Sequence, residues 1–188
     1  MRSGAIRSWL VFSLAILLAG AVWTWLSRAQ PGATSSGNIP APREGFLAPD
    51  FSLSDSKGKQ IRLSDYRGRP VLVNVWASWC APCKAEMPAM QRAYTDYQGR
   101  GFEILAVNST SQDSFESASA FAQANGLSFP ILYDSQADVA RQYQIQSLPT
   151  SFFIDNDGMI RDVVIGGPMS EALLRVRIEQ LFQTSQEP

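Results

Sequence analysis

The stretch from Val71 to Glu86, which reads VLVNVWASWCAPCKAE, decides the fold. Its first part, Val71–Trp76, is an apolar run interrupted by a single asparagine, which is typical of a strand buried on both faces. A helix is expected directly afterwards, from about Ala81 to Tyr97, because apolar residues recur there at steps of three and four. The sequence therefore predicts a buried strand that leads into a helix N-terminus, with Cys80 and Cys83 at the junction.

Strands and helices alternate through the rest of the chain. Two short strands before the quoted stretch flank Lys57-Gly58 and are expected to form a hairpin. Asp113 and Glu116 resemble a capping box that opens a later helix. The further strands are expected near 102–107, 130–133, 151–154 and 159–165, and the further helices near 113–125, 137–143 and 170–183. This order predicts an α/β sandwich with a mixed sheet.

The residue inventory excludes several kinds of active site. The chain has 188 residues, no histidine and two cysteines. The absence of histidine excludes Ser-His-Asp and Cys-His catalysis and histidine-ligated zinc or haem. Two cysteines exclude a disulfide framework and a four-cysteine zinc site, and Lys84 excludes C-x-x-C-H haem attachment. We therefore expect no metal and no cofactor. The mildly acidic body of the chain gives no indication of nucleic-acid binding.

The N-terminus has the pattern of a membrane signal. Arg2 and Arg7 precede Trp9–Leu26, a run without charge that is long enough to cross a bilayer core. Positive charge before such a run favours a cytoplasmic N-terminus and an exported C-terminal part. The sequence predicts a single-pass signal-anchor transmembrane helix over residues 1–26. A cleaved signal peptide is the alternative, with Ser27-Arg28-Ala29 as its cleavage site.

Residues 27–45 differ from both neighbours in composition. They are rich in proline, glycine, serine and alanine and offer little apolar surface to bury. This is typical of a flexible linker. The expected organisation is therefore an anchor over 1–26, a linker over 27–45 and one domain over 46–188.

The C-x-x-C pair carries the chemistry. The free N–H groups of a helix N-terminus stabilise an anion, so the Cys80 pKa is expected to fall from ~8.5 toward ~3.5–7.5. Cys83 lies three residues further on the same helix face, within disulfide reach of Cys80. Glu86 follows three residues later and is a candidate proton acceptor or donor for Cys83. The alternatives are a static disulfide, a Cu(I) site made by both thiolates, and a solvated charge at Glu86.

Longer stretches of the chain resemble a known family. From Phe46 to the C-terminus, the chain resembles the thioredoxin superfamily, and most of all its membrane-anchored extracytoplasmic oxidoreductases of the TlpA/ResA type. The matching stretches are Ala48–Phe51, Leu63–Cys80, Ser147–Thr150 and Phe153–Asp155. The resemblance implies a thioredoxin-like three-layer sandwich with a central mixed β-sheet and an extra N-terminal β-hairpin.

The resemblance also implies roles for individual residues. Cys80 matches the attacking thiol and Cys83 the resolving thiol, which together form a redox-active disulfide. Pro149 matches a cis-proline that faces the two cysteines. The backbone of Leu148 would pair with a substrate strand, and Trp79 would contact the same substrate.

An acidic residue of this subfamily matches Glu86. Cytoplasmic thioredoxins carry a buried aspartate where this chain has Asn74. The resemblance therefore implies that the proton-handling role of that aspartate passes to Glu86.

The expected activity is that of a protein-disulfide reductase, because Ala81-Pro82 supplies neither a charge nor an imidazole to stabilise the thiolate further. The resemblance implies exported disulfide-containing substrates such as apocytochrome c, in cytochrome c maturation, or copper-site proteins. It also implies a membrane thiol transporter as electron donor, and a catalytic domain on the extracytoplasmic side of the cell membrane. The alternatives are a disulfide-forming oxidase and a Cu(I)-handling protein for oxidase assembly. A peroxidase is the weakest candidate, because peroxide-reducing relatives typically lack the C-x-x-C partner.

Overall fold

The computed structural model describes residues 14, 16–24 and 39–184. The chain divides into two units, Met1–Ser35 and Ser36–Pro188. Residues 14 and 16–24 of the first unit are helical. The rest of the expected anchor and most of the expected linker lie outside the described residues. Within the described ranges, no helix combines the length and the apolar character that crossing a membrane requires.

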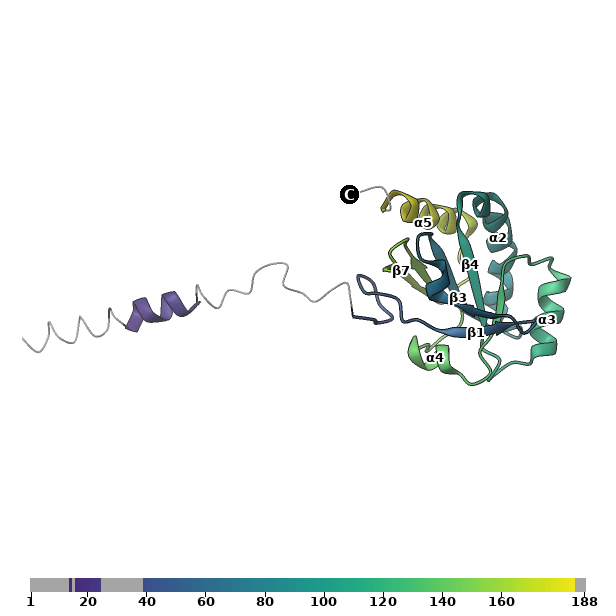
Figure 1. Cartoon of the computed structure of the whole chain (residues 1–188), viewed down its shortest axis with the longest axis horizontal. Coiled ribbons are helices and arrows are strands. Elements are labelled where there is room, and N and C mark those ends of the chain that lie inside the picture. Colours follow the sequence, from purple (N-terminus) through teal and green to yellow (C-terminus); the bar gives the residue numbers. More distant parts are fainter. Residues whose placement is uncertain (1–13, 15, 25–38, 185–188) are drawn as a thin grey trace, which may run out of the picture. The chain divides into compact units, whose positions relative to one another are not determined.

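In the described part of the second unit, seven strands form one mixed sheet (Figure 1). They are β1 (Ser52–Asp55), β2 (Gln60–Arg62), β3 (Val71–Trp76), β4 (Glu103–Asn108), β5 (Ile131–Tyr133), β6 (Thr150–Ile154) and β7 (Ile160–Ile165). Their order across the sheet is β2-β1-β5-β4-β3-β6-β7. β3, β4 and β5 run parallel, and the other neighbouring pairs are antiparallel.

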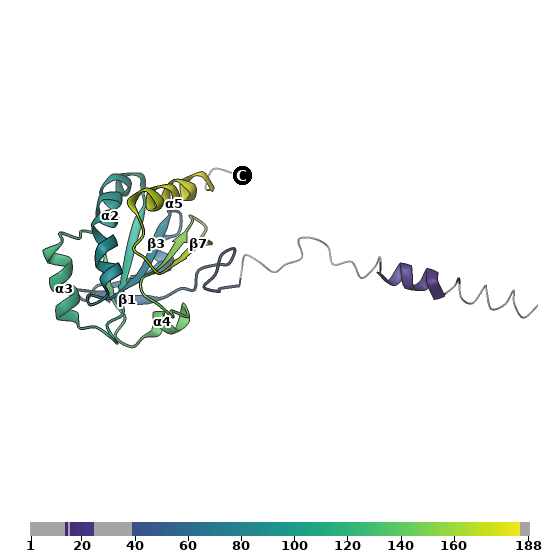
Figure 2. The same ribbon diagram turned by 180° about the vertical axis from the view of Figure 1, so that it is seen from behind.

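Helices cover both faces of this sheet. They are α2 (Ala81–Tyr97), α3 (Phe115–Ala124), α4 (Asp138–Gln142) and α5 (Glu171–Thr184), with short 3-10 helices at Leu63–Tyr66 and Gln98–Arg100. α2 and α5 lie side by side in both views of the domain (Figure 2). Ion pairs between Arg92 and Glu171, and between Arg175 and Asp96, join these two helices at their exposed surfaces.

The central strand β3 divides the core into two clusters. All six of its residues are buried, and their side chains alternate between the two faces of the sheet. Leu72 and Trp76 join the cluster beneath α2 and α5, whereas Val71, Val73 and Val75 join the cluster beneath α4 and the N-terminal hairpin. Two cores with one sheet between them make a three-layer sandwich, which confirms the expected fold class.

The N-terminal hairpin extends the sheet beyond its parallel part. Gly58 adopts a φ of +76° in the turn, and the Asp55 carboxylate accepts hydrogen bonds from the backbone N–H groups of Lys57 (2.8 Å) and Lys59 (2.9 Å). A glycine suits this left-handed conformation because it has no Cβ to clash. β1 then pairs with β5, so the extra hairpin is part of the sheet.

Residues just before the hairpin contact the far edge of the sheet. The Gly45 N–H donates to the carbonyl of Ile160, and the Ile160 N–H donates to the carbonyl of Phe46. The Glu44 carboxylate accepts a hydrogen bond from the N–H of Val163, also on β7. These bonds occupy part of the outer edge of β7, which would otherwise be free to pair with another strand.

Candidate active site

The two cysteines form a disulfide at the N-terminus of α2, as expected. Their Cα atoms lie 5.3 Å apart. Cys80 is the N-cap residue, and its sulfur accepts a hydrogen bond from the backbone N–H of Cys83 at 3.3 Å. Cys80 is 4% exposed and Cys83 is 0% exposed. Both cysteines are buried, Cys80 being the slightly more exposed residue, and the Cys80 sulfur lies where a helix N-terminus stabilises negative charge.

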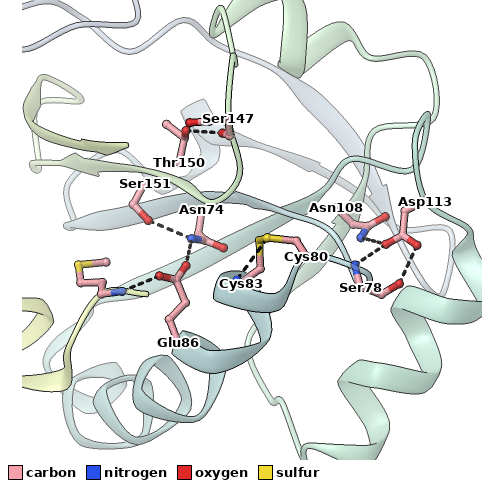
Figure 3. The surroundings of a disulfide bond; sticks show 11 residues. Asn74, Ser78, Cys80, Cys83, Glu86, Asn108, Asp113, Ser147, Thr150 and Ser151 are labelled. Carbon is pink, nitrogen blue, oxygen red and sulfur yellow. Dashed lines mark hydrogen bonds between the residues drawn. A yellow bond between two sulfur atoms is a disulfide. The ribbon is translucent and has the colours of Figure 1, made fainter. Parts of the chain in front are cut away.

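A buried hydrogen-bonded group lies beside the disulfide (Figure 3). Asn74 has the same parity on β3 as Leu72 and Trp76, so its side chain faces α2. Its Nδ2 donates to Glu86 Oε1 and to Ser151 Oγ, each at 2.9 Å. Because Asn74 is 0% exposed and Ser151 is also buried, this group is closed off from solvent.

Glu86 is a buried carboxylic acid rather than a solvated helix charge. It is 1% exposed, and its Oε2 accepts a hydrogen bond from the backbone N–H of Met169 at 3.0 Å. Burial raises the pKa of Glu86, while the hydrogen bonds from Met169 and Asn74 partly oppose that rise. A raised pKa means that the buried site favours the protonated, uncharged form of the carboxyl more than water does. Proton exchange between Glu86 and Cys83 stays a prediction.

The Leu148–Pro149 peptide bond is cis, as the resemblance implies. The loop is fixed by hydrogen bonds from Thr150 Oγ1 to the Ser147 carbonyl and from the Gly166 N–H to the Pro149 carbonyl, both 2.8 Å. Ser147 and Thr150 both appear in the surroundings of the disulfide in Figure 3. The cis-proline loop is therefore held between the start of β6 and the end of β7.

Gly167 links this loop to the buried acid. A Cβ atom at Gly167 would lie 2.9 Å from Pro149 Cγ and 3.0 Å from Glu86 Oε2. The ring of Pro149 and the carboxylate of Glu86 therefore both approach Gly167 so closely that a side chain there would force a neighbour to shift. The Gly167–Pro168 bond that follows is a second cis peptide, which the sequence did not reveal.

Trp79 and Leu148 line one pocket of about 200 Å³, whose lining carries no charged side chain. Trp79 is 57% exposed, and its Nε1 donates to the Gln112 carbonyl at 2.9 Å. Neither backbone group of Leu148 bonds to another backbone group among the described residues. The pocket thus combines an exposed indole with an unpaired backbone donor and acceptor, as pairing with an extended peptide requires.

Asp113 has a role that the sequence did not indicate. The helix cap predicted for it is wrong, because Ser114 is the N-cap of α3 and accepts from the Ser117 N–H at 3.0 Å. The Asp113 carboxylate instead accepts from Ser78 N–H (2.6 Å), Ser78 Oγ (2.7 Å) and Asn108 Nδ2 (2.8 Å). It thereby fixes the loop that carries Trp79 and Cys80.

The pKa of Asp113 reflects these contacts. Partial burial raises it, but the hydrogen bonds from Asn108, Ser78 and Ser114 outweigh burial and hold it below its usual value. A lowered pKa means that the folded state favours the charged carboxylate. The stabilisation is therefore present above the usual pKa and is lost as the pH falls through the lowered value.

Replacing Asp113 with alanine is expected to lower the free energy of unfolding by about 2 kcal/mol, since hydrogen bonds to a charged acceptor are lost together. Urea denaturation at neutral pH measures this change. Asp157→Ala, at an exposed turn position, is the matched control. It is expected to change the free energy of unfolding by less than about 0.5 kcal/mol. Equal stabilities for the two variants would show that Asp113 does not fix the loop.

Comparisons with known proteins show the family of the chain. The AhpC/TSA family matches residues 45–163. A relative named thiol-disulfide oxidoreductase ResA, from Geobacillus kaustophilus, is 44% identical over 131 residues, which are 70% of this chain and 74% of the relative.

Two crystal structures extend the agreement to the fold. That of StoA from Bacillus subtilis has a TM-score of 0.60 at 30% identity and covers 69% of this chain and 96% of its own. That of a thiol:disulfide interchange protein of the thioredoxin family, from Chlorobium tepidum TLS, has a TM-score of 0.67 at 25% identity and covers 77% and 97%. The chain belongs to the AhpC/TSA family and, within it, to the thioredoxin-like thiol–disulfide oxidoreductases.

Proposed function

We propose that the chain reduces disulfide bonds in exported proteins by dithiol exchange through Cys80 and Cys83. The observation that carries this proposal is the disulfide itself. Cys80, the slightly more exposed residue of the pair, is the N-cap of α2. An exchange reaction needs an accessible nucleophile whose thiolate is stabilised, together with a second thiol that can displace the substrate.

The reaction begins with the reduced pair. The Cys80 thiolate attacks one sulfur of a substrate disulfide, and the other substrate sulfur leaves as a thiolate. Cys83 loses its proton and attacks Cys80, which forms the Cys80–Cys83 bond and releases the second substrate thiolate. Two electrons pass from the enzyme to the substrate. Glu86 is the group proposed to take the Cys83 proton, and a thiol donor must then reduce the pair again.

The substrate is proposed to bind as an extended segment beside the cis-proline loop. The free backbone groups of Leu148 would form main-chain hydrogen bonds with it, and the neighbouring pocket beside Trp79 would accept an uncharged side chain. Pro149 would hold Leu148 in place for this contact. Such binding recognises the main chain of the substrate more than its side chains. It would therefore allow the reductase to act on several targets.

The proposed setting is the extracytoplasmic side of the cell membrane, with residues 1–26 as a single-pass anchor. The support is the sequence pattern, in which Arg2 and Arg7 precede an uncharged run. Apocytochrome c and copper-site proteins are the proposed substrates, and a membrane thiol transporter is the proposed electron donor. The relative named ResA supports the activity and names no substrate.

The direction of the reaction is tested by the reduction potential of the Cys80–Cys83 pair. No charged or imidazole side chain stands between the cysteines, so we expect a potential well below the value of about −120 mV that marks a strong oxidase. Equilibration with glutathione buffers, followed by counting of free thiols, gives this value. A potential near that of the oxidase would identify a disulfide-forming enzyme instead.

A further inference from the structure

One polar atom beside the disulfide has no hydrogen-bond partner in the described part of the chain. Asn74 is 0% exposed, and its nitrogen donates to both Glu86 and Ser151. Its carbonyl oxygen, Oδ1, is buried and accepts no hydrogen bond. Buried acceptors are almost always paired, because leaving one unpaired costs free energy. An acceptor without a donor at an active site therefore needs an explanation.

The position of this oxygen follows from its neighbours. The nitrogen of the Asn74 amide faces Glu86 and Ser151, to both of which it donates a hydrogen bond. The oxygen of the same amide then points away from Glu86. Figure 3 shows it on the side of the disulfide, while the nitrogen lies toward Glu86 and Ser151.

The oxidised pair cannot satisfy this oxygen, because disulfide sulfurs carry no hydrogen. Reduction adds two electrons and two protons, breaks the sulfur–sulfur bond and produces two thiols. Cys80 can release its proton at the helix N-terminus, where a thiolate is stabilised. Cys83 is 0% exposed and would keep its S–H, which is a hydrogen-bond donor.

We propose that Asn74 Oδ1 accepts a hydrogen bond from the Cys83 thiol in the reduced protein. Asn74 is then a positioning residue that favours the reduced state and holds the resolving thiol next to Glu86 until the mixed disulfide forms. Asparagine cannot take the proton itself, so the transfer still falls to Glu86, which Asn74 contacts. This inference rests on the proposed exchange function and assigns the part of the site that stabilises its dithiol form.

The first test is the equilibrium constant for reduction by dithiothreitol. Asn74→Leu removes the acceptor and keeps a similar volume, so the reduced form loses a hydrogen bond and the oxidised form loses an unpaired acceptor. The constant is expected to fall about tenfold, which corresponds to about 30 mV for a two-electron couple. Ser151→Ala removes another partner of the same amide but leaves Oδ1 in place, and is expected to change the constant less than about twofold.

A double-mutant cycle separates this effect from any action through the acid. Asn74→Leu also removes the donor to Glu86 Oε1, so it is repeated in a Glu86→Gln background. The fall in the equilibrium constant is expected to persist there. A fall that disappears in that background would overturn the proposal, because Asn74 would then act only on Glu86.

The second test observes the hydrogen bond directly. In a Cys80→Ala variant Cys83 is the only thiol of the chain, so its S–H stretching band in the infrared spectrum has a single origin. The band is expected at the lower frequency of a bonded thiol, and adding Asn74→Leu is expected to shift it upward. A band at the free-thiol frequency in Cys80→Ala alone would overturn the proposal, even if the double variant does not fold.

Equilibration with dithiothreitol distinguishes a failure of the exchange function from a failure of the role of Asn74. If the natural pair does not equilibrate with dithiothreitol at all, the exchange function is wrong. If the pair equilibrates and Asn74→Leu changes the constant less than about twofold, only the role of Asn74 is wrong.

Discussion

A Cys83→Ser variant is expected to accumulate covalent complexes with its protein targets, whereas a Cys80→Ser variant forms none. Cys80 is the N-cap of α2 and the slightly more exposed residue of the pair, so it is expected to attack the substrate first, while Cys83 is 0% exposed. Without Cys83 the mixed disulfide cannot be resolved inside the enzyme. Turnover should fall by about a thousandfold or more in both variants, since the two cysteines act as one unit.

The complexes are measured by incubating each variant with a mixture of exported proteins, followed by non-reducing electrophoresis and mass spectrometry. The Cys80→Ser/Cys83→Ser double variant is the blank, because it has no thiol. Complexes that form equally well through Cys83 would contradict the assigned order of attack. A stable Cu(I) complex of the natural protein, with no trapped partner from Cys83→Ser, would favour a metal-handling role.

A Glu86→Gln variant is expected to resolve its mixed disulfides about a hundredfold more slowly, the lower end of what a positioned acid or base contributes. Glutamine keeps the shape of the side chain but can neither take nor release the Cys83 proton. Rapid-quench measurement of the mixed disulfide isolates this step from the first attack by Cys80. Glu116→Gln makes the same change at an exposed position on α3 and is expected to leave the rate unchanged. A resolution rate equal to that of the natural protein would exclude Glu86 as the proton acceptor.

The same variant is expected to change how stability depends on pH. Burial raises the pKa of Glu86 in the folded protein above its usual value, so the folded state binds this proton more tightly than the unfolded state. The corresponding stabilisation is complete below the usual pKa and is lost as the pH rises through the raised value. Glu86→Gln should lack this loss. Urea denaturation across that pH range measures it, and parallel profiles for the two proteins would show that Glu86 is not linked to folding.

The elements that carry the site could be predicted because their signals are local. The apolar run predicted the bounds of β3, and the recurrence of apolar residues at steps of three and four predicted those of α2. The structure has the same bounds for both elements. Both bounds depend on residues that are neighbours in sequence. The disulfide likewise joins two residues that are three positions apart, and the hairpin follows from its Lys57-Gly58 turn.

The environment of each site residue depends on pairings that are distant in sequence. Glu86 is buried because the segment after β7 supplies the N–H of Met169. Asp113 reaches Ser78 because β4 pairs with β3 in a register that places Asn108 opposite Trp76. No local pattern at Asp113 distinguishes this contact from a helix cap. The sequence indicated which residues carry the chemistry but not the contacts that set their protonation and position.

The reduction potential of the Cys80–Cys83 pair tests the central claim most directly. The account describes a reductase, whose thiolate is stabilised by the N-terminus of α2 without an added charge or imidazole between the cysteines. We expect the reduction potential of the purified domain to lie far below about −120 mV. In a glutathione buffer that already reduces a strong oxidase, the Cys80–Cys83 pair should therefore remain largely oxidised. A potential at or above that value would contradict the account, because the pair would then donate disulfides to exported proteins instead of removing them.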